Sequence, residues 1–186
     1  MDSSGSVKDE DFKEEKKVVK KLVVNLDIAK DKTRAALVLF GTSPSLEVRF
    51  RQNETALNFQ DVLEKLPKMD DRTRIDRALD VTANQIFPDA RQGAYKIAII
   101  LTDGVQSTGA RGLRPASKPL RDAGVRVLAV GVGVGMEKRR LRLMTDSDED
   151  VVTTKNLQEH FQGILRDLIQ NECSKYQSVP NVVLGP

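Results

Sequence analysis

Asp2, Ser4 and Ser6 place one carboxylate and two hydroxyl groups at alternate positions near the start of the chain. In a turning loop, alternate residues can project to the same side, so these oxygens could converge on one point. Mg²⁺ prefers such hard oxygen ligands in near-octahedral geometry at about 2.0–2.1 Å. Three oxygens do not complete that shell, so a cation here needs ligands from other loops. Serine and aspartate beside a glycine are also ordinary turn residues, and Ser6 could simply cap a following helix.

Two later segments offer further oxygen ligands. Thr73 lies in a polar loop just before a predicted helix, and Asp103 follows an apolar run that ends at Thr102. If the strands run parallel, their carboxyl ends meet at one edge of the sheet, where such sheets bind ligands. Thr73 and Asp103 are therefore candidates for the same cation site as Asp2, Ser4 and Ser6.

Apolar periodicity divides the rest of the chain into alternating helices and strands. Helices are predicted at residues 7–30, 55–66, 75–87, 115–123, 137–144 and 156–173, and strands at residues 33–40, 45–50, 95–102, 125–132 and 150–153. The first two of these strands read as a hairpin. The continuous apolar runs at residues 95–102 and 125–132 are typical of strands buried on both faces. The sequence therefore predicts an α/β fold whose mostly parallel sheet is covered by helices on both faces.

Length and composition fit one globular domain of 186 residues, with 39% hydrophobic and 31% charged residues. The net charge is only +3, and there is no Trp and only two Tyr, so nothing indicates a nucleic-acid partner. The densest basic cluster, around Lys16 and Lys20, is interpreted as a solvated helix face. No apolar run approaches the ~20 residues of a membrane span.

Three motifs in this order resemble the metal-ion-dependent adhesion site of von Willebrand factor type A domains. They are Asp2-Ser3-Ser4-Gly5-Ser6, the Arg72-Thr73 loop before a helix, and Leu101-Thr102-Asp103-Gly104. The apolar segments 36–41, 97–101 and 127–133 match the family as well. The loop before Thr73 lacks the Gly-Gly often found there. The resemblance covers residues 1 to about 172 and is specific because its parts occur in the expected structural context.

The resemblance implies a function that neither spacing nor composition shows. Ser4 and Ser6 would ligate Mg²⁺ or Mn²⁺ through hydroxyls, Asp2 and Asp103 would act directly or through water, and Thr73 would bind when the site is engaged. One position would remain open for an acidic side chain of a partner, an extracellular matrix or cell-surface protein. The chain would then be a non-enzymatic adhesion module.

The resemblance also implies a doubly wound, six-stranded sheet whose antiparallel edge is the strand at residues 45–50. The family's first strand is an apolar run just before the aspartate, and here only Met1 represents it. We therefore expect a domain at residues 1–173 whose first strand is largely missing, followed by a linker at residues 174–186.

Two residues bear on localisation. Asn53 begins the sequon Asn53-Glu54-Thr55, a candidate glycosylation site on a predicted surface loop. Cys173, the single cysteine, stands where extracellular members of the family place a cysteine, and its disulfide partner would lie outside this chain. Both favour a secreted protein or the ectodomain of a surface protein. The alternative is an intracellular type A domain that serves as a scaffold in a multiprotein assembly.

Other chemistries are less well supported. The single histidine, His160, is predicted to be an exposed residue of the last helix, so no nucleophile–base pair forms around Asp2. The acidic run at residues 146–150 lacks the glycine and distal glutamate of an EF-hand loop and reads as a solvated turn. An enzyme is therefore not expected.

Overall fold

The computed structural model describes residues 1–29, 31–50 and 55–166. Its centre is a parallel sheet in which β4 (Arg126–Gly131) pairs with β3 (Ile97–Thr102) on one side and with β5 (Val151–Thr153) on the other. A second pair, β1 (Leu37–Leu39) and β2 (Ser45–Val48), is antiparallel. The predicted hairpin and the predicted antiparallel edge are thus confirmed.

Residues 1–3 join these two groups of strands. The amino group of Met1 donates to Val38 O on the β1 side (2.9 Å), and Asp2 N donates to Leu101 O in β3 (3.1 Å). The spatial order is therefore β2, β1, residues 1–3, β3, β4 and β5, and the α/β prediction is confirmed.

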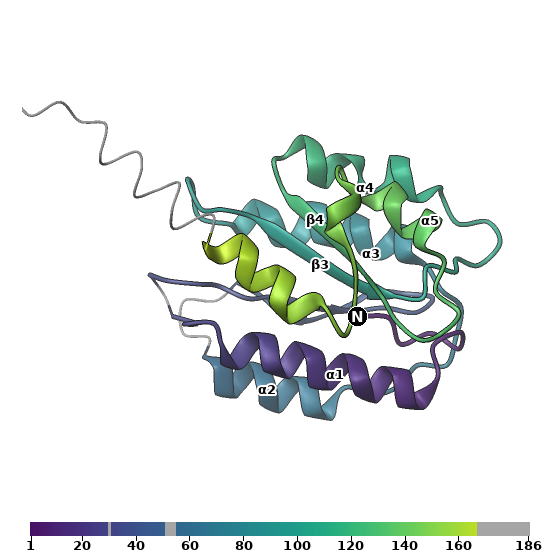
Figure 1. Ribbon diagram of the computed structural model, residues 1–186, viewed down its shortest axis with the longest axis horizontal. Helices are drawn as coiled ribbons and strands as arrows, with labels where there is room; N and C mark the ends of the chain where they lie inside the picture. Colours follow the sequence, from purple (N-terminus) through teal and green to yellow (C-terminus); the bar gives the residue numbers. More distant parts are fainter. Residues whose placement is uncertain (30, 51–54, 167–186) are drawn as a thin grey trace, which may run out of the picture.

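Helices cover both faces of this sheet, as Figure 1 shows for α1 and α2 on one side and α3 and α4 on the other. The bounds are α1 (Asp9–Val24), α2 (Ala56–Lys65), α3 (Ile75–Val81), α4 (Leu113–Asp122) and α5 (Lys138–Leu141). Residues 157–166 are also helical. Successive β4 side chains enter opposite layers: Leu128 and Val130 pack with α1, whereas Val127 and Ala129 pack with α3 and α4.

A cavity of about 450 Å³ remains in this core. Its lining comes mainly from apolar side chains of the segments around β1 and β3, including Leu37, Ile97 and Ile99. Met1 also lines it. Between β1 and β3, the described chain supplies only residues 1–3 as a bridging segment.

Four predicted helices have different bounds in the structure. The first ends at Val24 rather than near residue 30, because the Asn25 amide side chain and backbone N–H bond to carbonyls of the last turn. The third is α-helical only to Val81 and continues as a π-helix (Thr82–Ile86) and a 3₁₀ turn (Phe87–Asp89).

The fourth helix starts at Leu113, two residues earlier than predicted. The α5 helix is one turn long and is followed by 3₁₀ turns at Arg142–Met144 and Asp148–Asp150.

One interpretation of charged side chains holds in part and another was wrong. Lys17, Lys20 and Lys21 are exposed, but the Lys16 ammonium donates to Glu64 O and Leu66 O at the end of α2, and so caps that helix. His160 is half-buried and not exposed, with Nε2 3.6 Å from an oxygen of Asp150.

The acidic run at residues 146–150 is not a purely solvated turn either. Asp150 is buried and accepts hydrogen bonds from the guanidinium of Arg126 at 2.8 and 3.0 Å. Asp146 pairs with Arg121, so the run ties two neighbouring elements together.

Asn53, Cys173 and the predicted linker at residues 174–186 lie outside the described residues. Within the described residues, every helix is too short or too polar to cross a lipid bilayer.

Candidate metal centre

The three hydroxyl groups singled out in the sequence meet at one point. Ser4 Oγ lies 3.2 Å from Ser6 Oγ and 2.7 Å from Thr73 Oγ1, and the Ser6 and Thr73 oxygens are 3.3 Å apart. Ser4 and Thr73 are buried, whereas Ser6 is exposed. The three oxygens therefore form a triangle with one corner open to solvent.

The size of this triangle suits an octahedral cation. Two adjacent ligands at about 2.1 Å from Mg²⁺ are about 3.0 Å apart, and the measured oxygen separations lie on either side of that value. Ser4, Ser6 and Thr73 can therefore supply one face of a magnesium octahedron.

Asp2 lies behind the hydroxyl triangle and is fully buried. Its Oδ1 accepts hydrogen bonds from Ser4 Oγ (2.6 Å) and Ser4 N (3.0 Å), and its Oδ2 accepts one from Thr102 Oγ1 (2.6 Å). Burial raises the pKa of the Asp2 carboxyl, while the hydrogen bonds from Ser4 and Thr102 act in the opposite direction. Because both oxygens already have protein donors, Asp2 suits a water-mediated contact that orients Ser4 and adds negative charge.

Asp103 follows the end of β3 and adds a second carboxylate. It is buried to 9% exposure, and its Oδ1 accepts a hydrogen bond from Val105 N at 2.8 Å. The charge of Asp103 contributes to the raised pKa of Asp2, which places the two carboxyl groups in the same electrostatic environment.

Backbone hydrogen bonds hold the loop before Thr73 against the first loop. Ser3 O accepts from Asp70 N (3.0 Å), and Gly5 N donates to Asp71 O (2.8 Å). The Lys68 ammonium donates to Ser4 O at 2.7 Å. These bonds connect segments more than 60 positions apart and bring the threonine beside the serines.

Two features of the backbone accompany the loop before Thr73, which lacks Gly-Gly. Asp70 adopts φ +53°, a left-handed conformation that aspartate tolerates better than most residues. Gly41 faces the loop from the other side, and a Cβ there would lie 1.8 Å from Asp71 Oδ1. A side chain at position 41 would therefore displace the Asp71 carboxylate, which accepts a hydrogen bond from Thr42 N.

Several residues that position the site were missed from the sequence. Thr102 holds the Asp2 carboxylate, and Ser107 Oγ accepts a hydrogen bond from Thr73 N at 3.0 Å. Thr102 belongs to the recognised Leu101-Thr102-Asp103-Gly104 motif, so a signal existed for it. The sequence held no comparable signal for Ser107.

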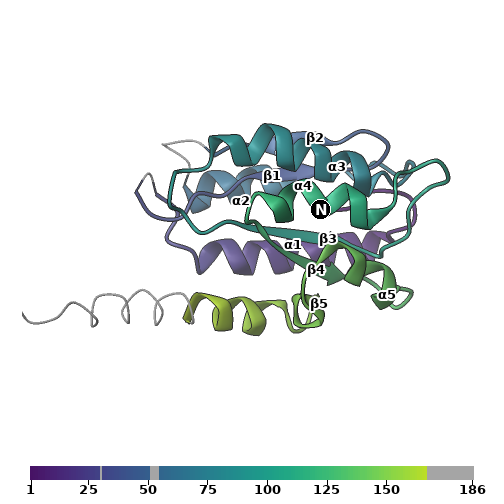
Figure 2. The ribbon, with the colours of Figure 1, turned by 90° about the horizontal axis from the view of Figure 1, so that it is seen from above.

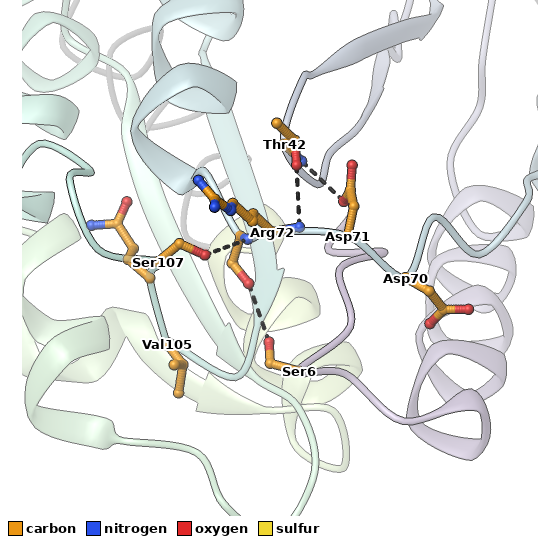
Figure 3. A pocket seen from close by; sticks show the side chains of 9 residues that line it. Ser6, Thr42, Asp70, Asp71, Arg72, Val105 and Ser107 are labelled. Carbon is orange, nitrogen blue, oxygen red and sulfur yellow. Dashed lines mark hydrogen bonds between the residues drawn. The ribbon is translucent and has the colours of Figure 1, made fainter.

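The site opens into a surface pocket of about 620 Å³. Figure 3 shows Ser6 at one side of this pocket and Thr42, Arg72 and Ser107 around it. The loop after β3, the start of α1 and α5 lie at the same end of the molecule, the carboxyl end of the parallel strands (Figure 2). A partner can therefore reach the hydroxyl triangle from solvent.

The ligand set is chemically unusual for a cation site. Within residues 1–29, 31–50 and 55–166, His, Cys, Asp and Glu never gather in groups of three or more that could hold a metal. A cation at this point would depend on the neutral hydroxyls, and its charge would be only partly neutralised by Asp2 and Asp103.

Fold and site together match one known family. The chain belongs to the von Willebrand factor type A domain family, whose model matches residues 1–167. Cuticlin-6 of Caenorhabditis elegans is 27% identical over 188 residues, covering 100% of this chain and 32% of cuticlin-6. The collagen alpha-5(VI) chain of Homo sapiens is 26% identical over 176 residues, covering 94% of this chain and 6% of the collagen chain.

A solved structure of similar fold carries a metal. The proximal thread matrix protein 1 of the mussel byssus, with a zinc-occupied metal-ion-dependent adhesion motif, superposes with a TM-score of 0.74 at 26% identity. The match covers 92% of this chain and 44% of the mussel chain.

The predicted extracellular location agrees with these relatives, which are secreted proteins of the extracellular matrix. The chain is thus an extracellular matrix type of domain, and it spans only a third or less of the curated relatives it matches.

Proposed function

We propose that this domain is a non-enzymatic adhesion module that binds Mg²⁺ or Mn²⁺ through Ser4, Ser6, Thr73, Asp2 and Asp103. Through that cation it binds an acidic side chain of an extracellular matrix or cell-surface protein. The observation that carries the proposal is the hydroxyl triangle, whose 2.7–3.3 Å edges suit one face of an octahedral cation.

Electrostatics support an acidic ligand. Two carboxylates can balance a divalent cation, but the three nearest oxygens are neutral, and Asp2 is already hydrogen-bonded on both oxygens. A poorly shielded cation at the bottom of an open pocket attracts a further carboxylate. The extracellular relatives favour this function over that of an intracellular scaffold.

The test measures cation binding by titration calorimetry and adhesion to a surface coated with extracellular matrix extract. Asp2→Ala removes a charge and the acceptor that orients Ser4, so it should abolish Mg²⁺ binding and adhesion together. Thr73→Ala removes one neutral oxygen and should weaken adhesion more than cation binding. Chelation should reproduce the effect of Asp2→Ala.

Matched controls are Asp31→Ala and Thr108→Ala, which remove an exposed aspartate and an exposed threonine outside the site. Both should bind Mg²⁺ and the coated surface as the unmodified chain does. Adhesion that persists in chelator and in Asp2→Ala would refute the proposal.

A further inference from the structure

Arg72 differs from the other basic side chains around the pocket. Four neighbouring cationic groups already have partners within the chain. The partners are Asp70 for Lys68, Asp76 for Arg74, the carbonyl of Thr42 for Arg77, and Asp80 for Arg111. Among the described residues, no acidic side chain lies within ion-pair distance of Arg72, and its side chain is exposed.

The backbone of Arg72 is nevertheless fixed. Its N–H donates to Thr42 Oγ1 at 3.1 Å, and the next residue is Thr73, whose N–H is held by Ser107. In Figure 3 the Arg72 side chain lies between Thr42 and Ser107. A free guanidinium therefore stands on an ordered loop, one residue from a corner of the hydroxyl triangle.

The acidic side chains of the same pocket do not neutralise the positive charge of Arg72. The carboxylate of Asp71 accepts a hydrogen bond from Thr42 N at 3.0 Å, and that of Asp70 pairs with Lys68. With a cation bound, the pocket presents two positive centres. The planar guanidinium fork matches the geometry of a carboxylate and can bind it through two parallel hydrogen bonds.

We propose that Arg72 is a second anchor, so that the pocket selects an extended partner segment with two acidic side chains. One carboxylate binds the cation and the other binds the Arg72 guanidinium. This inference rests on the proposed function. Cα atoms of adjacent residues are about 3.8 Å apart, and the arginine stem extends the reach beyond that. Side chains two residues apart on a strand lie about 7 Å apart on the same side, so we infer an acidic-x-acidic spacing for a segment that spans the pocket shared by Ser6, Thr73 and Arg72.

The probes are two fluorescently labelled synthetic peptides, Gly-Gly-Glu-Gly-Glu-Gly-Gly and Gly-Gly-Glu-Gly-Gln-Gly-Gly, titrated with the domain in Mg²⁺. The unmodified domain should bind the peptide with two glutamates about fivefold more tightly, as expected for one partly exposed ion pair. Arg72→Ala should abolish that preference, and Arg72→Glu should reverse it. The preference should survive in Arg49→Ala, which removes an exposed arginine just after β2.

Calorimetry with Mg²⁺ separates the proposal that Arg72 is a second anchor from the proposal that the domain binds through a cation. Arg72→Ala should bind the cation as the unmodified domain does, because the guanidinium is not a ligand. If both peptides bind equally in Mg²⁺, the Arg72 proposal is wrong and the metal-dependent function stands. If neither peptide binds in Mg²⁺, the proposed function fails, and this inference fails with it.

Discussion

At the residue scale, the hydroxyl of Thr102 helps to keep the buried Asp2 carboxylate ionised. Thr102 is fully buried, and its donation to Asp2 Oδ2 at 2.6 Å favours the ionised form of Asp2 against the effect of burial. Ser4 does the same for the other oxygen. The charge of Asp2 therefore depends on both neighbouring hydroxyls.

Thr102→Val keeps the shape of the side chain and removes this donor. We expect Mg²⁺ affinity to fall about fivefold to tenfold, because a lost hydrogen bond to a charged group costs about 1 kcal/mol or more. The midpoint of thermal unfolding should also fall, since a buried oxygen loses its partner. Calorimetry and circular dichroism measure the two effects. Thr102→Ser retains the hydroxyl, and a cation affinity as low as that of the valine variant would contradict this explanation.

The sequence was enough to name the candidate site residues that the fold brings together. It was not enough to name all the residues that position them. Asp2, Ser4 and Ser6 were found because alternation along one loop is visible in the sequence. The Ser107–Thr73 contact joins two loops 34 positions apart, and its direction depends on how those loops turn. The closeness of Gly41 to the Asp71 carboxylate was likewise not visible, because it involves two segments.

At the element scale, a core cavity adjoins the position between β1 and β3. The Met1 ammonium is buried there, which lowers its pKa, and it donates to Val38 O at 2.9 Å where a ladder amide would stand. A cavity of about 450 Å³ continues from it along both strands. The apolar lining of this cavity and the bond to Val38 O lead us to propose that an apolar strand can occupy it.

We therefore predict that an apolar strand of about six residues fused ahead of Met1, a typical strand length, raises the melting temperature by several degrees. The amide would keep the bond to Val38 O without burying a charge, and apolar side chains would fill the cavity. Differential scanning calorimetry measures the shift. A Gly/Ser extension of equal length is the control, and an equal melting temperature for the two extensions would show that the strand does not enter the cavity.

The order and type of the strands were predicted well because long apolar runs and alternation are strong local signals. Helix ends were predicted less well. Asn25 ends α1 because its side chain bonds to a carbonyl in the last turn of that helix. The π-helix at Thr82–Ile86 precedes Pro88, whose missing N–H prevents a regular helical continuation. Apolar periodicity continues through both positions, so it does not report either change.

At the scale of the whole molecule, the ion pair between Arg74 and Asp76 makes the stability of the fold depend on pH. Both residues lie beside the loops around the site. The Arg74 guanidinium holds Asp76 through two hydrogen bonds of 2.8 Å and, with a backbone N–H of Arg111, lowers the pKa of that carboxyl to about 2. Because the native pKa lies below the unfolded value, the charged form stabilises the fold at neutral pH. This stabilisation is lost as the pH falls from about 4 to about 2.

Asp76→Asn should therefore lower the free energy of unfolding by about 1–2 kcal/mol at pH 7, less than the full equivalent of the pKa shift because Arg74 partly faces solvent. The difference from the unmodified chain should shrink as the pH falls through that window. Urea unfolding at a series of pH values measures it. Asp31→Asn, at an exposed position, is the control and should follow the unmodified chain. A constant difference between Asp76→Asn and the unmodified chain at all pH values would show that the ion pair is not the cause.

The long separations across the site bear on when it forms. Ser4 and Thr73 are 69 positions apart, and Asp2 and Thr102 are 100 positions apart. Long chain loops must close before these groups meet, so we expect these contacts to form late in folding. A cation that recognises only the assembled oxygens would slow unfolding and leave the rate of folding unchanged. If the proposed cation binds there, the magnesium or manganese concentration outside the cell would then set the lifetime of the folded molecule, whereas the chain alone would set its rate of folding.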